Sequence, residues 1–242
     1  MVGRGADLQV LRAAWETAQV AGPRAAVIRG EAGIGKSRLV TELLESIDGE
    51  AAVAVGQCLD TGGAVGAPFA SIKGIVQDLG AAFGAEALLE AAGRNADVLT
   101  SLVPRLDRGR PGDRPDLGEA SGEDVHEAFG DVLEALSEER PIVVLLEDLH
   151  WADVTTLALL SALLRRLRRS RVLVLLTYRP EDLGRGHPLR PLLIQLDRNP
   201  AVDRVELAAL DEETVAEQAG LILGRRLDQL ELSQVVRRSD GV

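Results

Sequence analysis

Cysteine and aromatic residues are scarce in this sequence of 242 residues. Its one cysteine, Cys58, excludes an intrachain disulfide and fits a reducing compartment. We interpret it as a small buried side chain rather than a reactive thiol. Aromatic residues make up 2% of the chain, whereas hydrophobic residues make up 46%. The core must therefore consist mainly of Leu, Val, Ile and Ala, in a chain long enough for one large domain with a small appendage.

Excess positive charge and long apolar runs are also lacking. The formal net charge is -11, and a surface of that sign repels phosphate backbones, so we expect no direct binding of nucleic acid. We interpret the basic run at 165–171 as a helix C-terminus, where cations complement the helix dipole, rather than as a nucleic-acid patch. No stretch reaches the roughly 18 apolar residues of a membrane span, and the N-terminus lacks a signal-peptide layout. We therefore expect a cytoplasmic protein without membrane contact.

Strand-like and helix-like segments alternate along the chain. Continuous apolar runs predict strands at 24–30, 51–57, 141–148, 171–179 and 202–207. Periodic apolar positions predict helices at 6–20, 39–47, 69–82, 86–103, 154–169 and 188–199. Such alternation is typical of crossover connections between parallel strands. The sequence therefore predicts an α/β fold with a parallel five-stranded sheet.

Changes in composition predict where the domain ends. Residues 104–120 are rich in Pro, Gly and charge and predict a mobile surface loop. Ser121 is the predicted N-cap of the next helix, with Asp124 three residues on. From Asp211 the pattern is helical, and the chain stops at "RRSDGV", which indicates a fragment of a longer protein. We predict one domain over 1–208 and the truncated beginning of a helical subdomain over 209–242.

The stretch "GEAGIGKS" fits the pattern G-x-x-x-x-G-K-[ST] between a predicted strand and a predicted helix. Glycines let consecutive N–H groups turn inward around an anion, and the helix N-terminus points at the same place. Lys36 supplies a cation for the β- and γ-phosphates, and Ser37 a hydroxyl for Mg²⁺. The alternative, a glycine-rich turn without a ligand, does not explain the whole pattern in this context. The predicted nucleotide-binding residues are Gly30, Glu31, Ala32, Gly33, Ile34, Gly35, Lys36, Ser37 and Arg38.

Polar side chains follow two further strands. Glu147 and Asp148 end "IVVLLED", at the edge where α/β sheets bind ligands. One of them would hold Mg²⁺ together with Ser37 and the other would polarise the attacking water, and the sequence leaves the two roles open. Arg179 ends "VLVLLTYR" and is the candidate sensor of the γ-phosphate, although pairing with a surface acid is the alternative. The predicted catalytic residues are thus Asp148, Glu147 and Arg179, and the predicted metal ligands Ser37, Glu147 and Asp148.

Four blocks carry a family resemblance: "VGRGADLQVLRAAWETA", "GEAGIGKSRLV", "LLEDLHWAD" and "LLTYRPED". Together they resemble the ATPase module of the STAND branch of AAA-related P-loop NTPases, above all that of large ATP-binding LuxR-family transcriptional regulators. Similar modules occur beside nucleotide-cyclase and kinase domains. The resemblance implies a three-layer sandwich whose sensor strand separates the P-loop strand from the acidic strand. It also implies ATP or ADP with Mg²⁺, slow hydrolysis and switching controlled by the nucleotide.

The resemblance also bears on single residues. It implies that Val2 and Arg4 lie near adenine, while Gly5 replaces the acid of the family's N-terminal motif. We interpret Trp151 as a packing residue at the sheet edge, His150 as no metal ligand, and Asp153 as a helix cap.

Three functions remain open from the sequence. They are a regulatory ATP switch that acts through self-association or effector domains, a remodelling motor, and a scaffold that holds nucleotide without hydrolysis. A guanine nucleotide is disfavoured, since no N-K-x-D motif occurs.

Overall fold

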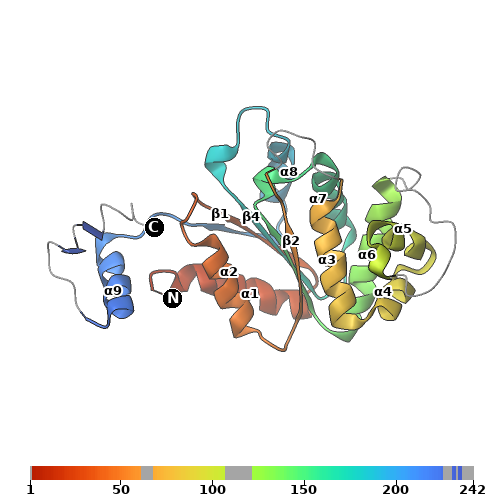
Figure 1. Cartoon of the computed structure of the whole chain (residues 1–242), viewed down its shortest axis with the longest axis horizontal. Coiled ribbons are helices and arrows are strands. Elements are labelled where there is room, and N and C mark those ends of the chain that lie inside the picture. The colour runs from red at the N-terminus through yellow and green to blue at the C-terminus, as the bar shows by residue number, and fades with distance from the viewer. Residues whose placement is uncertain (1, 61–67, 107–121, 226–230, 233, 236–242) are drawn as a thin grey trace.

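One parallel sheet organises the molecule (Figure 1). The computed structural model describes residues 2–60, 68–106, 122–225, 231–232 and 234–235. Its sheet has five strands in the order β2-β3-β4-β1-β5, and every neighbouring pair is parallel. The strands are β1 (Arg24–Arg29), β2 (Ala52–Gln57), β3 (Ile142–Glu147), β4 (Val172–Tyr178) and β5 (Val202–Glu206). The predicted α/β fold is confirmed, and β4 separates β1 from β3 as the resemblance implies.

Helices cover both faces of the sheet, and this explains the continuous apolar strands (Figure 1). On one face, α1 (Gly5–Val20) and α2 (Lys36–Ser46) pack against alternate residues of the inner strands, such as Ile28 and Leu175. On the other face lie α3 (Ala70–Phe83), α6 (Gly122–Glu139), α7 (Val154–Arg166) and α8 (Leu189–Asp197). The short helices α4 (Ala85–Ala92) and α5 (Ala96–Leu102) pack outside them, against α6.

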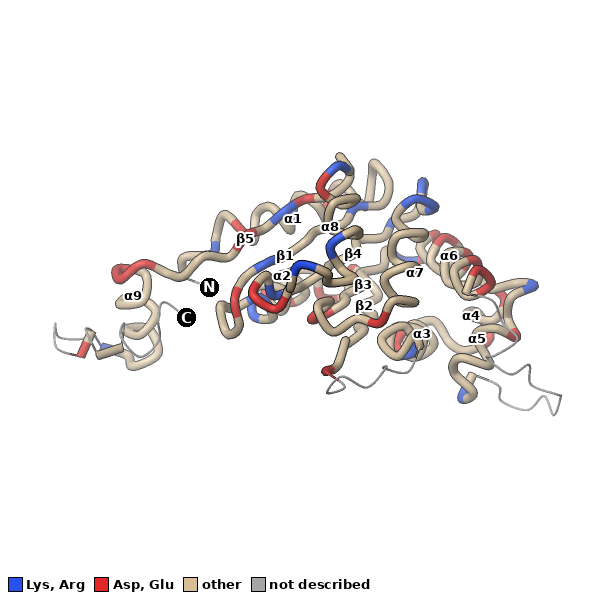
Figure 2. Tube along the Cα trace, turned by 90° about the horizontal axis from the view of Figure 1, so that it is seen from above, with Lys and Arg blue, Asp and Glu red and all other residues tan. Residues whose placement is uncertain are grey.

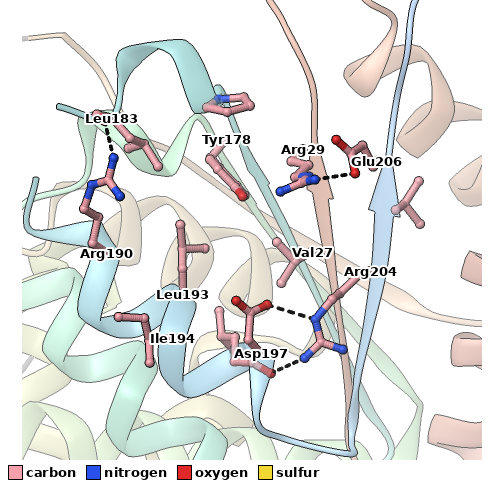
Figure 3. Close-up of a pocket in the computed structure, with 13 residues that line it drawn as sticks. Val27, Arg29, Tyr178, Leu183, Arg190, Leu193, Ile194, Asp197, Arg204 and Glu206 are labelled. Carbon is pink, nitrogen blue, oxygen red and sulfur yellow. Dashed lines mark hydrogen bonds and ion pairs between the residues drawn. The ribbon is translucent and has the colours of Figure 1, made fainter. Parts of the chain in front are cut away.

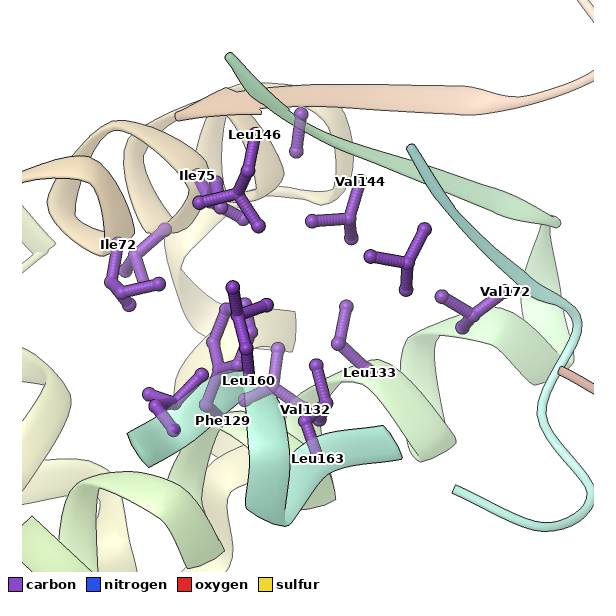
Figure 4. Packing of buried hydrophobic residues seen from close by; sticks show 14 of the residues in the cluster. Ile72, Ile75, Phe129, Val132, Leu133, Val144, Leu146, Leu160, Leu163 and Val172 are labelled. Carbon is purple, nitrogen blue, oxygen red and sulfur yellow. The ribbon is translucent and has the colours of Figure 1, made fainter. Parts of the chain in front are cut away.

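The larger of the two clusters of buried hydrophobic residues includes the space between the sheet and helices α6 and α7. Figure 4 shows Phe129, Val132 and Leu133 of α6 directed toward the sheet residues Val144 and Leu146. The large apolar side chains of α6 recur every three or four residues, and each of them is buried. A continuous aliphatic core of this kind keeps the strand ends fixed relative to one another.

Replacing Phe129 by alanine is expected to lower the free energy of unfolding by about 3–5 kcal/mol, because it leaves a cavity in a packed core. The side chain is 1% exposed and is among the largest fully buried ones. Urea denaturation measures the change. Val20→Ala, at a side chain that is 88% exposed, is the control and should stay within about 0.5 kcal/mol of the wild type. Equal losses in the two variants would contradict this description of the core.

Several predicted boundaries need correction. The predicted helix at 86–103 is broken into α4, a 3-10 turn and α5, because Gly93 takes a φ of 54° and interrupts the helical backbone. The predicted helix at 154–169 ends at Arg166. Residues 104–106 form a 3-10 turn rather than loop. The remainder of the predicted loop and the cap at Ser121 lie outside the described residues.

Charged residues are interspersed over the described surface (Figure 2). Acidic residues lie along α6 and gather at the start of α9 (Glu212–Leu223). The basic run begins in the last turn of α7, where Arg166 pairs with Asp131. Beyond the helix, Arg171 donates hydrogen bonds to backbone carbonyls at the end of α6. These contacts are those of a helix C-terminus tied to its neighbour, as the sequence suggests.

The helix α9 follows β5 and lies apart from the sheet (Figure 1). Asp211 caps it by accepting a hydrogen bond from the Thr214 N–H at 2.8 Å. Leu221, Ile222 and Leu223 are 69%, 77% and 53% exposed, so these apolar side chains at the end of α9 are largely open to solvent. None of the described helices combines the length and apolar content needed to cross a membrane.

Cys58 is buried directly after β2, as predicted. Burial raises the pKa of its thiol to about 12, against an ordinary value of 9.0. Since the thiolate is the reactive form, we expect iodoacetamide to label the native protein about a thousandfold more slowly than the unfolded protein at pH 8. Mass spectrometry over time measures both rates. Rapid labelling of the native protein would contradict the buried position.

Candidate functional site

The loop between β1 and α2 is shaped to receive an anion. Gly33 and Gly35 take φ values of 75° and 102°, in the left-handed region that glycine adopts without strain. Gly35 is the N-cap of α2, and no side chain caps this helix. The N–H groups of the first turn are therefore left for a ligand, at the positive end of the helix dipole.

Lys36 begins α2 and lies under the loop with 7% of its surface exposed. Its Nζ donates hydrogen bonds to the carbonyls of Gly30 and Glu31, at 2.6 and 2.7 Å. Burial and the charge of Arg179 lower the pKa of Lys36, while nearby carboxylates oppose the shift. The ammonium is thus largely desolvated, and its attraction to an anion is correspondingly strong.

Ser37 and Glu147 meet across the sheet edge. The Ser37 Oγ donates a hydrogen bond to Glu147 Oε1 at 3.1 Å, although 110 residues separate them in the chain. This places a hydroxyl and a carboxylate side by side, which are oxygen ligands that Mg²⁺ accepts. Arg38, in contrast, directs its side chain along α2 to Glu42, so only its backbone lies at the loop.

Asp148 has an unusual backbone. Its φ is 55°, which is rare outside glycine and occurs more often for Asp than for most residues. The Asp148 N–H donates a hydrogen bond to Thr177 Oγ1 at 3.0 Å, and its Oδ1 lies 3.6 Å from Arg179 Nε. The strain and these contacts turn the carboxylate away from the line of β3 and hold it beside the end of β4.

His150 adjoins this group of charges. Its Nε2 lies 3.3 Å from Asp182 Oδ2, and neither ring nitrogen makes a hydrogen bond within the part of the chain that the structure describes. Burial lowers the pKa of His150, so the ring is mainly neutral at pH 7. Trp151 is 40% exposed, so the prediction that it packs at the sheet edge is only partly right. Asp153 caps α7 as predicted, by accepting from the Thr156 N–H at 2.9 Å.

Arg4 connects three parts of the chain. It is 8% exposed, and its Nη2 donates to the carbonyl of Ile34 in the loop at 3.2 Å and to that of Ala208 after β5 at 2.7 Å. The half-buried Val2 lies two residues before it. Arg4 therefore holds the N-terminal segment against both the loop between β1 and α2 and the connection to α9. The resemblance implies that adenine lies near this N-terminal segment.

A carboxylate that the sequence reasoning missed bonds to the loop itself. The Ala32 N–H donates to Glu181 Oε1 at 2.9 Å. Glu181 lies in the 3-10 turn Pro180–Asp182, directly after the end of β4. The signal was present in "YRPED", where two acids follow a strand that ends at the site. Because a loop N–H already holds an anionic oxygen, and Lys36 lies below it, these residues fit a nucleotide phosphate.

A separate cavity of about 580 Å³ is lined by residues of α8 and of the strands β1, β4 and β5. Figure 3 shows that its charged groups are paired within the protein: Arg29 with Glu206, and Arg204 with Asp197. Arg190 donates to the carbonyl of Leu183 at 2.7 Å. The last contact matters for the site, because it fixes the turn that carries Glu181.

Sequence comparisons identify the class of domain. The model of the AAA ATPase domain family matches residues 1–175. The uncharacterized protein R02095 of Rhizobium meliloti (strain 1021) is 29% identical in an alignment 218 residues long. The alignment covers 81% of this chain and 20% of that protein. The chain therefore spans about a fifth of the length of this relative.

Three solved structures are similar. A Signal Transduction ATPase with Numerous Domains (STAND) protein with a tetratricopeptide repeat sensor, from Pyrococcus horikoshii, has a TM-score of 0.50 at 16% identity, over 100% of this chain and 28% of that one. Cdc6p from Pyrobaculum aerophilum has a TM-score of 0.53 at 14% identity, over 94% of this chain and 51% of that one. The Aeropyrum pernix ORC2 protein in its ADP form has a TM-score of 0.50 at 16% identity, over 99% of this chain and 57% of that one. At such identities the likeness shows the shared fold alone.

Proposed function

Since the chain belongs to the AAA ATPase domain family, we propose that it binds ATP with Mg²⁺ and hydrolyses it slowly, as a regulatory switch within a longer cytoplasmic protein. The observation that carries this proposal is the meeting of Lys36 and Ser37, at the start of α2, with Glu147 at the end of β3. A cation, a hydroxyl and a carboxylate from two distant parts of the sequence thus converge at one glycine-rich loop.

We propose a role for each residue from its position. The loop amides and Lys36 bind and orient the β- and γ-phosphates, and Ser37 and Glu147 offer oxygens to the metal. Magnesium, when bound, neutralises charge on the phosphate oxygens. Asp148, held by Thr177 and a strained backbone, accepts the proton of the attacking water. Arg179 lies next to Asp148, and we propose that it contacts the γ-phosphate. We thus favour Glu147 as the metal ligand and Asp148 as the base.

The switch itself would lie between the two proposed parts, 1–208 and 209–242. Arg4 bonds to both Ile34 of the loop and Ala208, so a change in the loop reaches the connection to α9 directly. The exposed Leu221 to Leu223 end of α9 supports a helical subdomain that continues beyond it. We propose that this part conveys the state of the nucleotide to effector domains or to a second copy. A LuxR-type regulator is the parent that the sequence resemblance suggests, and none of the relatives above carries that description.

A scaffold that holds nucleotide without hydrolysis is the second candidate. Asp148 Oδ1 lies 3.6 Å from Arg179 Nε, so this cation competes with an attacking water for the carboxylate oxygen. The rate of phosphate release from ATP, measured by a coupled assay, separates the switch from the scaffold and from a motor. The switch predicts turnover well below the 1–1000 s⁻¹ or so that is typical of enzymes. Turnover within that range would favour a motor and contradict the switch, and none above a control without protein would favour the scaffold.

A further inference from the structure

The carboxylate of Glu181 occupies a place that the proposed function assigns to phosphate. It accepts a hydrogen bond from the Ala32 N–H, inside the glycine loop. We propose that Glu181 is a specificity-determining residue, which disfavours the terminal phosphate of ATP relative to ADP. This inference rests on the proposed nucleotide site and names the discrimination that the site makes.

The direction from which Glu181 approaches indicates which phosphate it opposes. The groups proposed for hydrolysis, Glu147, Asp148 and Arg179, lie at the ends of β3 and β4. The terminal phosphate must point toward them. Glu181 extends from the same end of β4 and reaches the loop from that side. Its charge therefore faces the end of the triphosphate that ADP lacks.

Backbone hydrogen bonds fix the turn that carries Glu181. The Leu183 N–H donates to the Pro180 carbonyl at 3.1 Å and closes the turn. Arg190 of α8 donates to the carbonyls of Leu183 and Gly184, both at 2.7 Å. The neighbouring Asp182 is directed to His150 instead of the loop. Of the two acids in this turn, the contacts thus direct Glu181 to the phosphate loop and Asp182 away from it.

The exposure of the Glu181 carboxylate to solvent limits how strongly it can discriminate between ATP and ADP. The bond between Ala32 and Glu181 is open to solvent, so water and salt weaken the repulsion between the carboxylate and a phosphate. Binding of ATP would displace the carboxylate at a modest cost, whereas ADP would leave it in place. We expect a discrimination of roughly three- to tenfold between ATP and ADP from this one charge.

Dissociation constants for ATP and ADP with Mg²⁺, measured by isothermal titration calorimetry on the whole chain, test this. Glu181→Gln keeps the shape and an acceptor oxygen but removes the charge, and Glu181→Ala removes both. In each variant the ratio of the ATP constant to the ADP constant should fall by about three- to tenfold. Glu139→Gln is the matched control, an exposed residue at the end of α6 and at the far edge of the sheet, and its ratio should not change.

The outcomes are distinguishable. Binding of both nucleotides with an unaltered ratio in both Glu181 variants would overturn this inference and leave the proposed function standing. A change of the same size in Glu139→Gln would also overturn it, since net charge alone would then explain the effect. Absence of binding in the wild type would overturn the proposed function and this inference with it.

Discussion

Alanine in place of Lys36 is expected to reduce the affinity for ATP by at least about 30-fold, which corresponds to a loss of about 2 kcal/mol or more. The reason is burial: Lys36 is 7% exposed and its ammonium donates to two loop carbonyls, so water cannot substitute for it when a phosphate arrives. Equilibrium dialysis with labelled ATP measures the loss. Lys36→Ala should reduce ADP binding as well, since the β-phosphate shares the same cation.

The sequence supplies a matched control for this variant. Lys73 on α3 is the other lysine of the chain, and it is not part of the site. Lys73→Ala removes the same charge and should leave ATP binding within about twofold of the wild type. Thermal unfolding of both variants shows whether each one folds. A well-folded Lys36→Ala protein with wild-type affinity would contradict the role of the loop.

The second large effect is expected on turnover. Asp148→Asn should lower kcat for ATP hydrolysis by about 100-fold or more while changing KM little, because an amide cannot accept the proton of water. The backbone at position 148 favours this variant, since Asn tolerates the observed φ of 55° as well as Asp does. Steady-state phosphate release measures both constants. The exposed Asp97 of α5 provides the control, and Asp97→Asn should behave as the wild type.

Glu147 is expected to respond differently. Glu147→Gln weakens the oxygen pair with Ser37, so it should raise the Mg²⁺ concentration needed for half-maximal hydrolysis. Asp148→Asn should leave that concentration nearly unchanged. The reverse pattern would exchange the roles of the two acids, which the sequence left open, and equal effects would contradict a division of labour between them.

The fold could be predicted because its signals are local. Continuous apolar runs such as residues 142–146 identify strands that are buried on both faces, and the periodic positions of α6 identify its buried side. The glycine loop was recognisable because each of its positions has a backbone requirement. The break at Gly93 was missed, since an isolated glycine does not reveal its own φ.

Contacts between distant segments could not be predicted in the same way. The bond of Arg4 to Ala208 and that of Ala32 to Glu181 join residues 204 and 149 positions apart. Each depends on the strand order and on the path of a short turn after the strand. The apolar pattern determines which face of an element is buried, but it leaves open where a charged side chain at its end is directed. The contact of Glu181 with the loop therefore became visible only in the structure.

Calorimetric titration of the intact, folded chain with ATP in the presence of Mg²⁺ tests the central claim most directly. We predict saturable heat that fits one site per chain and is abolished when GTP replaces ATP. No heat with ATP, on protein shown to be folded by its thermal transition, would contradict the assignment of the glycine loop as a nucleotide site.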